Sequence, residues 1–384
     1  MHPRTVIGRI GATVLLTVLA LGVATPAAAQ GPPVTTGAVF NDPYGSAAEQ
    51  DAIKDHIIST VHATPPGETI RAALYALTDQ DYTDALVDAH QRGVGVRVVL
   101  DSKYSERPAS QNLVAALGRD TSQASWVTVC HQASACIAHG GVNPINHNKF
   151  FLFTRVGTGP VANHVVLQTS ANETALNTEK YFNNAYTVVG NRRLYDAYLG
   201  YFDDLAAMVG NNAYFTTGRA GPYTYYFFPQ ETGDVVVDIL GDVTCTGNHR
   251  VGTPDGRSIV RVAAFALHRA GVADALIALA GAGCRVELLY AESNQVEKLT
   301  GVPNLDLRRL RTDDGYLVHS KYFLIEGGHA GHREQKLTFT GSHNLDFSSL
   351  RENDEAMMRI DGDEAHDAYR ANFRHMFDLA VPVT

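Results

Sequence analysis

Apolar positions follow two different periods along this chain, and their order predicts alternating helices and strands. Residues 46–49 form a capping box, and apolar side chains recur behind it at helical spacing (Ile53, Ile57, Ile58 and Val61). Residues 70–77 then predict a strand, and residues 84–91 predict a helix. The apolar run 94–101 is typical of a strand that is buried on both faces.

The second half repeats this succession, with strands predicted at 259–267 and 285–290 around a helix near 274–276. Strands that alternate with helices favour an α/β sandwich in each half. The helices that close the halves correspond at a spacing of 171 residues, 369 less 198 (Asp196, Ala197, Tyr198 and Phe202 with Asp367, Ala368, Tyr369 and Phe373).

Residues 210–222 are rich in Gly, Asn and Thr and end in Gly-Pro, which indicates a break between the halves. We therefore predict one lobe at 30–215, a linker at 216–222 and a second lobe at 223–384. The expected fold is α/β, with two lobes related by a pseudo-twofold axis and an active site at their interface.

The first residues predict an export signal rather than part of the fold. Arg4 and Arg9 precede an apolar stretch at 10–23, and Ala27-Ala28-Ala29 offers a small-residue cleavage site. The stretch is short for a membrane span, which needs roughly 20 residues. We expect a signal peptide at 1–29 and a soluble, secreted, monomeric mature protein.

The charge balance lowers the expectation of a nucleic-acid partner. The chain has 31 Lys and Arg against 40 Asp and Glu, a net charge of −9. Loss of Arg4 and Arg9 with the signal peptide makes this about −11. Proteins that grip nucleic acid through its phosphates usually carry a basic surface.

Four cysteines in an exported chain predict two disulfides, for which three connectivities exist. We favour Cys130–Cys136, which closes a small loop, and Cys245–Cys284 in the second half. No CxxC pair or His/Cys cluster occurs in the sequence, so no structural zinc site is expected. We predict no metal and no cofactor.

One polar pattern occurs twice in the same register. His147-x-Lys149 precedes Ser170-x-Asn172, and a second copy lies 172 residues later, 319 less 147 and 344 less 172 (His319, Lys321, Ser342 and Asn344). A lone His-x-Lys usually marks only a polar strand end, and a lone Ser-x-Asn usually marks a turn. Because four positions keep one spacing, the pair predicts a duplicated fold that unites both copies.

These residues suit work on a phosphodiester. Alternate residues of a strand share a face, so His147 and Lys149 would point into one site, as would their counterparts. A neutral imidazole can attack phosphorus, and a protonated one can donate a proton to the departing oxygen. Two lysines and two asparagine amides can stabilise the charged oxygens.

The paired motifs resemble the signature of the phospholipase D superfamily, His-x-Lys-(x)4-Asp followed by Gly-Ser-x-Asn. The second copy matches with Glu326 in place of the aspartate, and the first has Thr154 there and Thr169 in place of the glycine. The resemblance covers nearly all of the mature chain. Residues 226–229 and the passage 92–101 also look like family features.

The resemblance implies a phosphohistidine intermediate, no metal requirement, and hydrolysis or transfer to an alcohol. By analogy with secreted bacterial members, His147 is the nucleophile and His319 the acid and then the base. The family also tends to place an acid downstream to hold each histidine at Nδ1. Glu355 fits that position in the second lobe, and its first-lobe counterpart at a spacing of 171 is Asn184. Ser170, Ser342 and Asn184 are expected to contact the substrate.

The aromatic run 223–228 admits two interpretations. It could be a lipid-contacting lip, or it could begin the second lobe as a buried strand, which we favour.

Three functions compete on this sequence. The leading one is a secreted phosphodiesterase that cleaves phospholipid head groups, with peripheral contact to a membrane and with water or an alcohol as acceptor. The second is a secreted metal-independent nuclease of the same superfamily. The third is a non-catalytic phosphate-binding relative, which Thr154 and Asn184 favour but the six paired His, Lys and Asn residues oppose.

Overall fold

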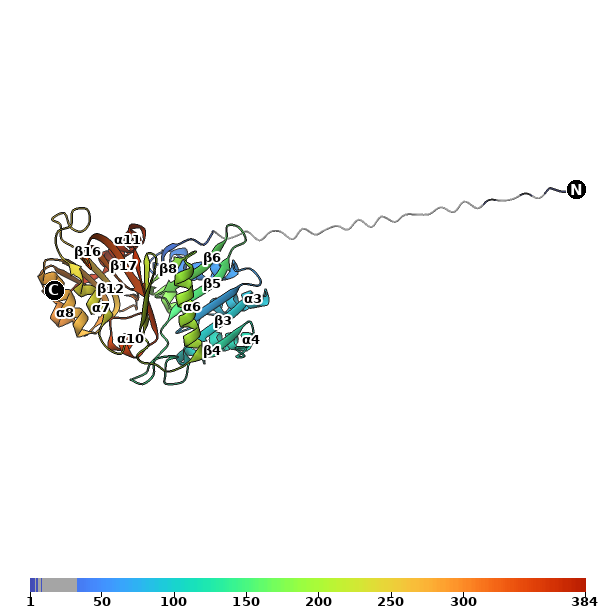
Figure 1. Ribbon diagram of the computed structural model, residues 1–384, viewed down its shortest axis with the longest axis horizontal. Coiled ribbons are helices and arrows are strands. Elements are labelled where there is room, and N and C mark those ends of the chain that lie inside the picture. Colours follow the sequence, from blue (N-terminus) through green and yellow to red (C-terminus); the bar gives the residue numbers. More distant parts are fainter. Residues whose placement is uncertain (4, 6–7, 9–32) are drawn as a thin grey trace. The chain divides into compact units, whose positions relative to one another are not determined.

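Two mixed β-sheets, one in each half of the chain, carry the motifs in the computed structural model (Figure 1). The structure describes residues 1–3, 5, 8 and 33–384. The rest of the predicted signal peptide, with its cleavage site, lies outside the described residues. Residues 33–384 form one compact unit. No helix in the described part is long and apolar enough to cross a membrane.

The first sheet has the strand order β1-β8-β6-β5-β2-β3-β4. In chain order, its strands are β1 Gly37–Phe40, β2 Thr69–Leu74, β3 Gly95–Leu100, β4 Trp126–Val129, β5 Lys149–Val156, β6 Ala162–Thr169 and β8 Asn184–Val188. The strands β2, β3 and β4 run parallel, whereas β5 is antiparallel to β2. The predicted buried strand at 94–101 is β3.

The second sheet repeats this plan with the order β19-β14-β13-β12-β16-β17-β18-β10-β9, and β11 pairs with β16. Its strands are β9 Thr216–Ala220, β10 Tyr223–Phe228, β11 Val243–Thr244, β12 Ile259–Leu267, β13 Arg285–Ser293, β14 Leu305–Arg309, β16 Lys321–His329, β17 His332–Gly341, β18 Glu355–Asp361 and β19 Val381–Pro382. The strand predicted at 259–267 has the bounds of β12.

Helices cover both faces of each sheet, as expected of strands that read as continuous apolar runs. They are α1 Ala47–Gln50, α2 Ala52–His62, α3 Gln80–Gln91, α4 Pro108–Leu117, α5 Ala175–Glu179, α6 Arg192–Ala207, α7 Val235–Gly241, α8 Ala270–Gly281, α9 Val296–Leu299, α10 Phe347–Arg351 and α11 Asp363–Leu379. A short 3-10 turn spans Ser102–Tyr104. The predicted capping box opens α1, where Glu49 accepts a hydrogen bond from the backbone of Ser46 at 2.7 Å.

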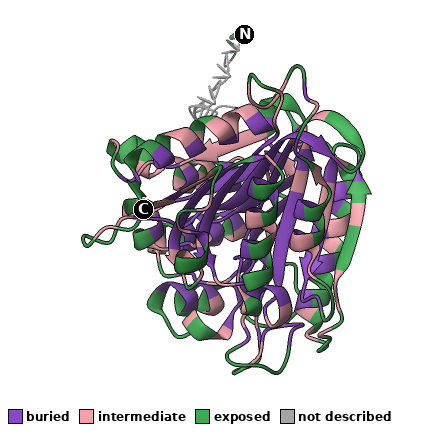
Figure 2. Ribbon diagram, turned by 90° about the vertical axis from the view of Figure 1, so that its left-hand side faces the viewer, coloured by how far each residue is buried: buried purple, intermediate pink, exposed green. Residues whose placement is uncertain are grey.

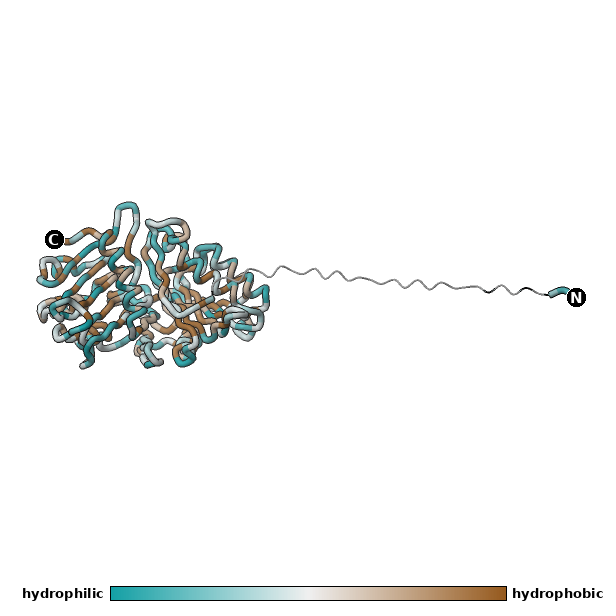
Figure 3. Tube along the Cα trace, turned by 90° about the horizontal axis from the view of Figure 1, so that it is seen from above, coloured by the Kyte–Doolittle hydropathy of each residue, from teal (hydrophilic) through white to brown (hydrophobic). Residues whose placement is uncertain are grey.

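The closing helices α6 and α11 pack into a core that both sheets share. Tyr198 of α6 meets Phe227 of β10 edge-on at 5.0 Å, so a helix of the first half packs on a strand of the second. Two further apolar cores lie under the outer helices, one in each half. In Figure 2 the strands are largely buried, and in Figure 3 hydrophobic segments run through the middle of the trace, whereas hydrophilic segments are frequent along its outline. The predicted α/β fold is therefore found, with a common core between the lobes.

Residues 216–222 form a hairpin rather than the expected open linker. Thr216–Ala220 is strand β9, and Ala220 pairs with Tyr223 of β10 across a two-residue turn. Gly221 adopts φ of +67° in this turn, a conformation that glycine reaches without steric cost. The Gly-rich composition therefore reflects a turn, and the segment before it is an edge strand of the second sheet.

The aromatic run 223–228 lies inside the second sheet. As β10 it pairs with β18 on one side and with β9 on the other. Phe227 and Phe228 are buried, and Phe227 stacks on Tyr201 of α6 at 4.3 Å. This run is therefore core, and the lipid-lip interpretation of these residues is wrong.

Candidate active site

The two lobes exchange backbone contacts at the motif histidines. The His147 amide donates to the carbonyl of Asp354 at 2.9 Å, and the His319 amide donates to that of Phe182 at 2.9 Å. Phe182 belongs to a short strand, β7 Tyr181–Phe182, which pairs with β15 Leu317–Val318 just before His319. Asn146 and Asp354 form the matching bridge beside His147. Each histidine is thus fixed by the opposite lobe, as a pseudo-twofold arrangement requires.

The side-chain partners of the histidines also cross between lobes. His147 Nδ1 lies 2.8 Å from Glu355 Oε1, and His319 Nδ1 lies 2.8 Å from Asn183 Oδ1. Asn183 Oδ1 also accepts the Ser170 hydroxyl proton at 2.9 Å, so it is an acceptor and His319 Nδ1 carries a hydrogen. Both rings then leave Nε2 for chemistry. Glu355, expected to serve its own lobe, holds the histidine of the other lobe.

Asn184 was predicted to be the counterpart of Glu355 and to contact the substrate, and the structure contradicts both predictions. Its amide group donates to Thr340 Oγ1 at 2.7 Å and to the Tyr369 hydroxyl at 3.0 Å, inside the shared core. The counterpart is Asn183, since 355 less 183 is 172, the spacing of the motifs. The spacing of 171 applies only from the closing helices onward, because the first lobe has one residue more between this strand and its helix.

Burial and nearby lysines control the protonation of both imidazoles. His147 and His319 are buried, and desolvation lowers the pKa of each well below its ordinary value. The charges of Lys149 and Lys321 lower both pKa values further, and His147 lowers that of His319. The side chains of the two motifs are therefore close enough to interact. Both rings are neutral near pH 7, the state in which an imidazole can attack.

Aromatic rings enclose the two imidazoles. Tyr75 meets His147 edge-on at 5.0 Å, whereas His319 lies between Tyr181 at 5.4 Å and Phe265 at 5.0 Å. These contacts supply the desolvation that lowers the pKa of each histidine.

The lysines are held in parallel fashion. Lys149 Nζ donates to the carbonyl of His147 at 2.6 Å, and Lys321 Nζ donates to that of His319 at 2.5 Å. Burial lowers the pKa of Lys149 to about 8, although Glu355, Glu173 and Asp101 partly offset this effect. Burial also lowers the pKa of Lys321 well below its ordinary value. Two ammonium groups that have lost much of their hydration form a strong site for an anion.

The serines of the turns position backbone rather than face a substrate. Ser170 Oγ accepts from the Asn184 amide at 3.0 Å, and Ser342 Oγ accepts from the Ala356 amide at 3.1 Å. Both serines are fully buried. Their predicted role as substrate contacts is therefore replaced by a structural one, in which they tie each turn to the strand that follows.

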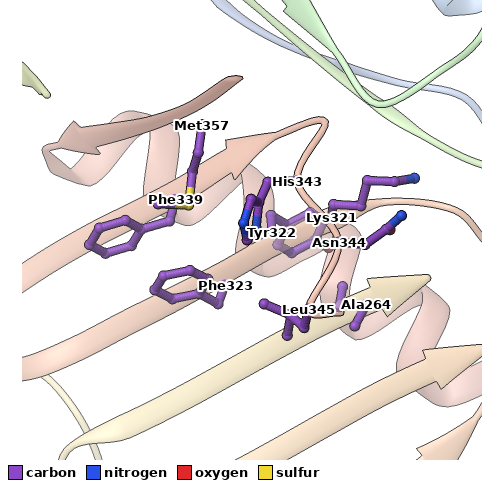
Figure 4. Close-up of a pocket in the computed structure, with 10 residues that line it drawn as sticks. Ala264, Lys321, Tyr322, Phe323, Phe339, His343, Asn344, Leu345 and Met357 are labelled. Atoms are coloured by element: carbon purple, nitrogen blue, oxygen red, sulfur yellow. The ribbon is translucent and has the colours of Figure 1, made fainter. Parts of the chain in front are cut away.

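The asparagines Asn172 and Asn344 end these turns beside the lysines. In Figure 4 the ends of Lys321 and Asn344 point to the same side, whereas the His343 ring points the other way, into the core. The Oδ1 atoms of both asparagines have no hydrogen-bond partner within the described part of the chain. A phosphoryl oxygen needs a donor, so the Nδ2 groups of these side chains, rather than the Oδ1 atoms, would bind it.

A small cavity lies beneath the second turn, with a volume of about 10 Å³, enough for about one water molecule (Figure 4). His343 lines it, and its ring stacks near Phe228 at 4.3 Å. Burial lowers the pKa of His343 well below its ordinary value. Sequence reasoning passed over His343 because its counterpart, Ala171, has no side chain that could work with it.

Glu173 is a second residue that the sequence did not single out. Its side chain is buried directly after Asn172, and neither carboxyl oxygen has a hydrogen-bond partner among residues 33–384. Burial raises the pKa of Glu173 to about 8, and Lys149 opposes this rise. The corresponding residue of the second lobe is Leu345, so the first lobe has an additional carboxyl beside its lysine. The acid was visible in the sequence, but its burial was not.

Asp354 was also missed as a structural anchor. Its carboxylate accepts from the amides of Cys136 at 2.8 Å and Ala138 at 2.7 Å. The predicted disulfide Cys130–Cys136 shapes this loop, and the predicted disulfide Cys245–Cys284 is also present; both pairings are confirmed. Cys136 of the first disulfide therefore contacts Asp354, which directly precedes Glu355 in the chain.

The substituted motif positions lie away from the histidines. Thr154 Oγ1 donates to Glu68 at 2.7 Å, and Glu326 accepts from Arg261 at 2.8 Å. Neither contacts an imidazole, so neither substitution removes a group from the site. Among residues 33–384 no cluster of three or more His, Cys, Asp or Glu side chains is arranged to hold a metal.

The arrangement unites one neutral imidazole oriented by a carboxyl, a second oriented by an amide, two lysines and two asparagine amides. Such a site can hold a phosphoryl group, attack it from one side and protonate the leaving oxygen on the other. It defines a class of enzymes that act on phosphodiesters with paired histidines.

The family model for the cardiolipin synthase, PLD-like domain matches residues 58–206 and 256–377. The chain therefore belongs to the phospholipase D superfamily, whose members are phosphodiesterases and phosphotransferases. The two matched segments contain one copy of the paired motif each.

Solved structures support the same fold. Phosphatidylserine synthase of Haemophilus influenzae Rd KW20 superposes with a TM-score of 0.58 at 15% identity, over 90% of this chain and 87% of that one. Polyphosphate kinase of Porphyromonas gingivalis gives 0.55 at 14% identity, over 89% of this chain but only 49% of the kinase, so this chain spans about half of that protein. No curated protein matches the sequence.

Proposed function

We propose that this protein is an exported phosphodiesterase that cleaves the head-group phosphodiester of phospholipids through a phosphohistidine. The observation that carries the proposal is the contact between His147 Nδ1 and Glu355 Oε1 at 2.8 Å. It fixes the ring so that a neutral Nε2 is available to phosphorus, whereas His319 has only an amide partner. The two histidines therefore differ in the way that a nucleophile and a proton donor must differ.

In the first step, His147 Nε2 forms a bond to phosphorus as the bond to the head-group oxygen breaks. Protonated His319 gives its Nε2 proton to that oxygen, so the head group leaves as a neutral alcohol. A bound phosphate monoanion favours the protonated form of His319 by offsetting the charges of both lysines, which lower its pKa. As charge develops on His147, Glu355 stabilises the imidazolium.

In the second step, water or an alcohol attacks phosphorus and gives its proton to His319. The bond from phosphorus to His147 breaks, and both histidines return to their starting states. Lys149, Lys321 and the two asparagine amides hold the phosphoryl oxygens throughout. Hydrolysis and transfer differ only in the acceptor.

Two observations favour a lipid over a nucleic acid. The net charge of −9 offers little attraction to a polyanion. The matched family model is described by a lipid enzyme, cardiolipin synthase. A nuclease of the same superfamily is the competing outcome of the test.

The test uses the mature protein in EDTA with phosphatidylcholine micelles, and separately with single- and double-stranded DNA. Release of choline supports the proposal, whereas DNA cleavage without choline release would establish the nuclease. His147→Asn and His319→Asn should each lower turnover by at least about 10³-fold. Mass spectrometry of wild type that is rapidly denatured at alkaline pH during turnover should detect a phosphatidyl adduct at His147; an adduct at another residue would contradict the assignment.

A further inference from the structure

Large apolar side chains are exposed on both helices that follow the catalytic turns. Leu176 of α5 is 55% exposed, and Phe347, the first residue of α10, is 60% exposed. Each helix begins three residues after the asparagine of its lobe, and the two side chains lie in the first turns of these corresponding helices, Leu176 at the second residue and Phe347 at the first. Exposed groups of this size on corresponding helices beside one site indicate a surface for a partner.

Val142 adds a third apolar group from the loop that leads into His147. It is 79% exposed. Its loop is tied to the end of α10, where the Ile145 amide donates to Asn353 Oδ1 at 3.2 Å. Val142 and Phe347 therefore lie on segments that contact each other. We call Val142, Leu176 and Phe347 the apolar lip.

A pocket of about 380 Å³ lies between Leu176 of the lip and the surroundings of the histidines. Its lining includes Tyr104, Arg107, Asn172, Leu176 and Tyr181. Tyr181 stacks on His319 at 5.4 Å, and Tyr104 packs edge-on against Tyr75, which in turn packs against His147. The pocket therefore reaches from Leu176 to the neighbours of both histidines.

The charges around this pocket fit a phospholipid. Arg107 lies at its edge, is exposed, and has no carboxylate partner among residues 33–384. A cation beside an apolar rim matches the order of groups in a lipid monolayer, in which phosphate lies next to hydrocarbon. The net charge of −9 disfavours long-range attraction to an anionic surface, so attachment has to depend mainly on apolar insertion.

We propose that the apolar lip inserts into the surface of a zwitterionic phospholipid layer, and that the adjoining pocket receives the glycerol-proximal hydrocarbon of the diester. This inference rests on the proposed function and adds to it how the enzyme reaches an aggregated substrate. The Tyr223–Phe228 run has no part in it.

The experiment compares Leu176→Ser, Phe347→Ser and the triple variant Val142→Ser, Leu176→Ser, Phe347→Ser with wild type. The control is Val161→Ser, which replaces an apolar residue that is 41% exposed at the far end of β5 and β6. Binding to phosphatidylcholine vesicles is measured by sedimentation at low and high salt. Hydrolysis is measured on vesicles and on a short-chain phosphatidylcholine below its micelle concentration.

We expect each single variant to bind vesicles several-fold more weakly and the triple variant at least about tenfold more weakly. The ratio of vesicle to monomer hydrolysis should fall in parallel, and the control should match wild type. Wild-type binding should change little with salt. Thermal unfolding tests that each variant is folded, which exposed side chains should not disturb.

The proposed insertion of the apolar lip would be wrong if the triple variant bound vesicles as strongly as wild type. It would also be wrong if binding of the wild-type protein fell steeply with increasing salt. A wild-type protein that cleaves no phospholipid, monomeric or aggregated, would refute the proposed function instead. The monomeric substrate therefore separates the two failures.

Discussion

At the scale of single residues, the two lobes differ most where they orient their histidines. Glu355 and Asn183 occupy corresponding positions, and each contacts the Nδ1 atom of the histidine in the opposite lobe at 2.8 Å. A carboxylate stabilises a positive imidazole, whereas an amide only orients it. The duplication therefore supplies two similar rings, and one difference between the lobes gives these rings partners of different charge.

The protonation of Glu355 should control the activity on the acid side. Burial raises the pKa of Glu355 to about 8, so the carboxylate that stabilises His147 forms as pH rises through this value. Burial lowers the pKa of Lys149 to about 8, so this lysine loses its positive charge as the pH rises above that value. We expect kcat/KM to pass through a narrow maximum near pH 8. A pH series with a monomeric diester measures this.

Glu355→Gln should lower kcat roughly 10²- to 10⁴-fold and remove the rising limb of that profile. The comparison variant Asn183→Asp keeps Glu355 and should therefore keep the rising limb. A profile of unchanged shape in Glu355→Gln would show that another group controls the acid side.

At the scale of elements, a buried ion network ties three neighbouring strands of the second sheet. Arg261 of β12 contacts Glu287 of β13 at 2.9 Å and Glu326 of β16 at 2.8 Å. In the first sheet the corresponding arginine is Arg71, which pairs in register with Leu152 as Arg261 pairs with Leu324, and the motif position two residues further along β5 holds Thr154 where β16 has Glu326. The glutamate that replaces the family aspartate is therefore part of a strand-to-strand tie that the first lobe lacks.

Arg261→Met should reduce the free energy of unfolding by about 3 kcal/mol, because it leaves the buried Glu326 without its close cation, whereas Glu287 keeps Arg285 and Arg374. Arg71→Met is the matched control. It removes a half-buried guanidinium whose Nε has no partner in the described part of the chain and which forms no ion pair there, so we expect a change within about 1 kcal/mol. Urea unfolding of both variants measures the difference. Equal losses would mean that burial of the arginine stem matters more than the ion pairs.

At the scale of the whole molecule, the lobes work as one body because they share a core and a site. The helices α6 and α11 and strands of both sheets contribute to that core. The two disulfides serve this body differently: Cys245–Cys284 closes a long segment within the second lobe, and Cys130–Cys136 shapes a short loop that contacts Asp354 of the other lobe.

Removal of the Cys245–Cys284 disulfide should mainly lower stability, whereas removal of the Cys130–Cys136 disulfide should mainly lower activity. The Cys245–Cys284 pair is separated by 39 residues and the Cys130–Cys136 pair by 6. Because a longer closed loop restricts the unfolded chain more, replacing Cys245 and Cys284 with alanines should lower the free energy of unfolding by about 1.5 kcal/mol more than replacing Cys130 and Cys136. The Cys130 and Cys136 variant should instead lose more activity, because its loop supports Asp354 beside Glu355.

Calorimetry and kcat/KM of both double-alanine variants measure these effects. If the Cys130 and Cys136 variant kept full activity with Asp354 intact, the loop would have no part in positioning Glu355.

Local patterns in the sequence were sufficient for the repeated strands and helices and the paired motifs, and, together with the expectation of an export signal, for the disulfides. Periodicity and spacing express local geometry, and two identical spacings express a duplication. Only the tertiary structure decided that Glu355 serves His147, that Asn183 rather than Asn184 faces His319, and that the aromatic run 223–228 is core. The partner of a side chain in another lobe depends on how two distant strands meet, and a one-residue shift in register changes every such partner. The burial of Glu173 and His343 likewise depends on long-range packing, which no local pattern records.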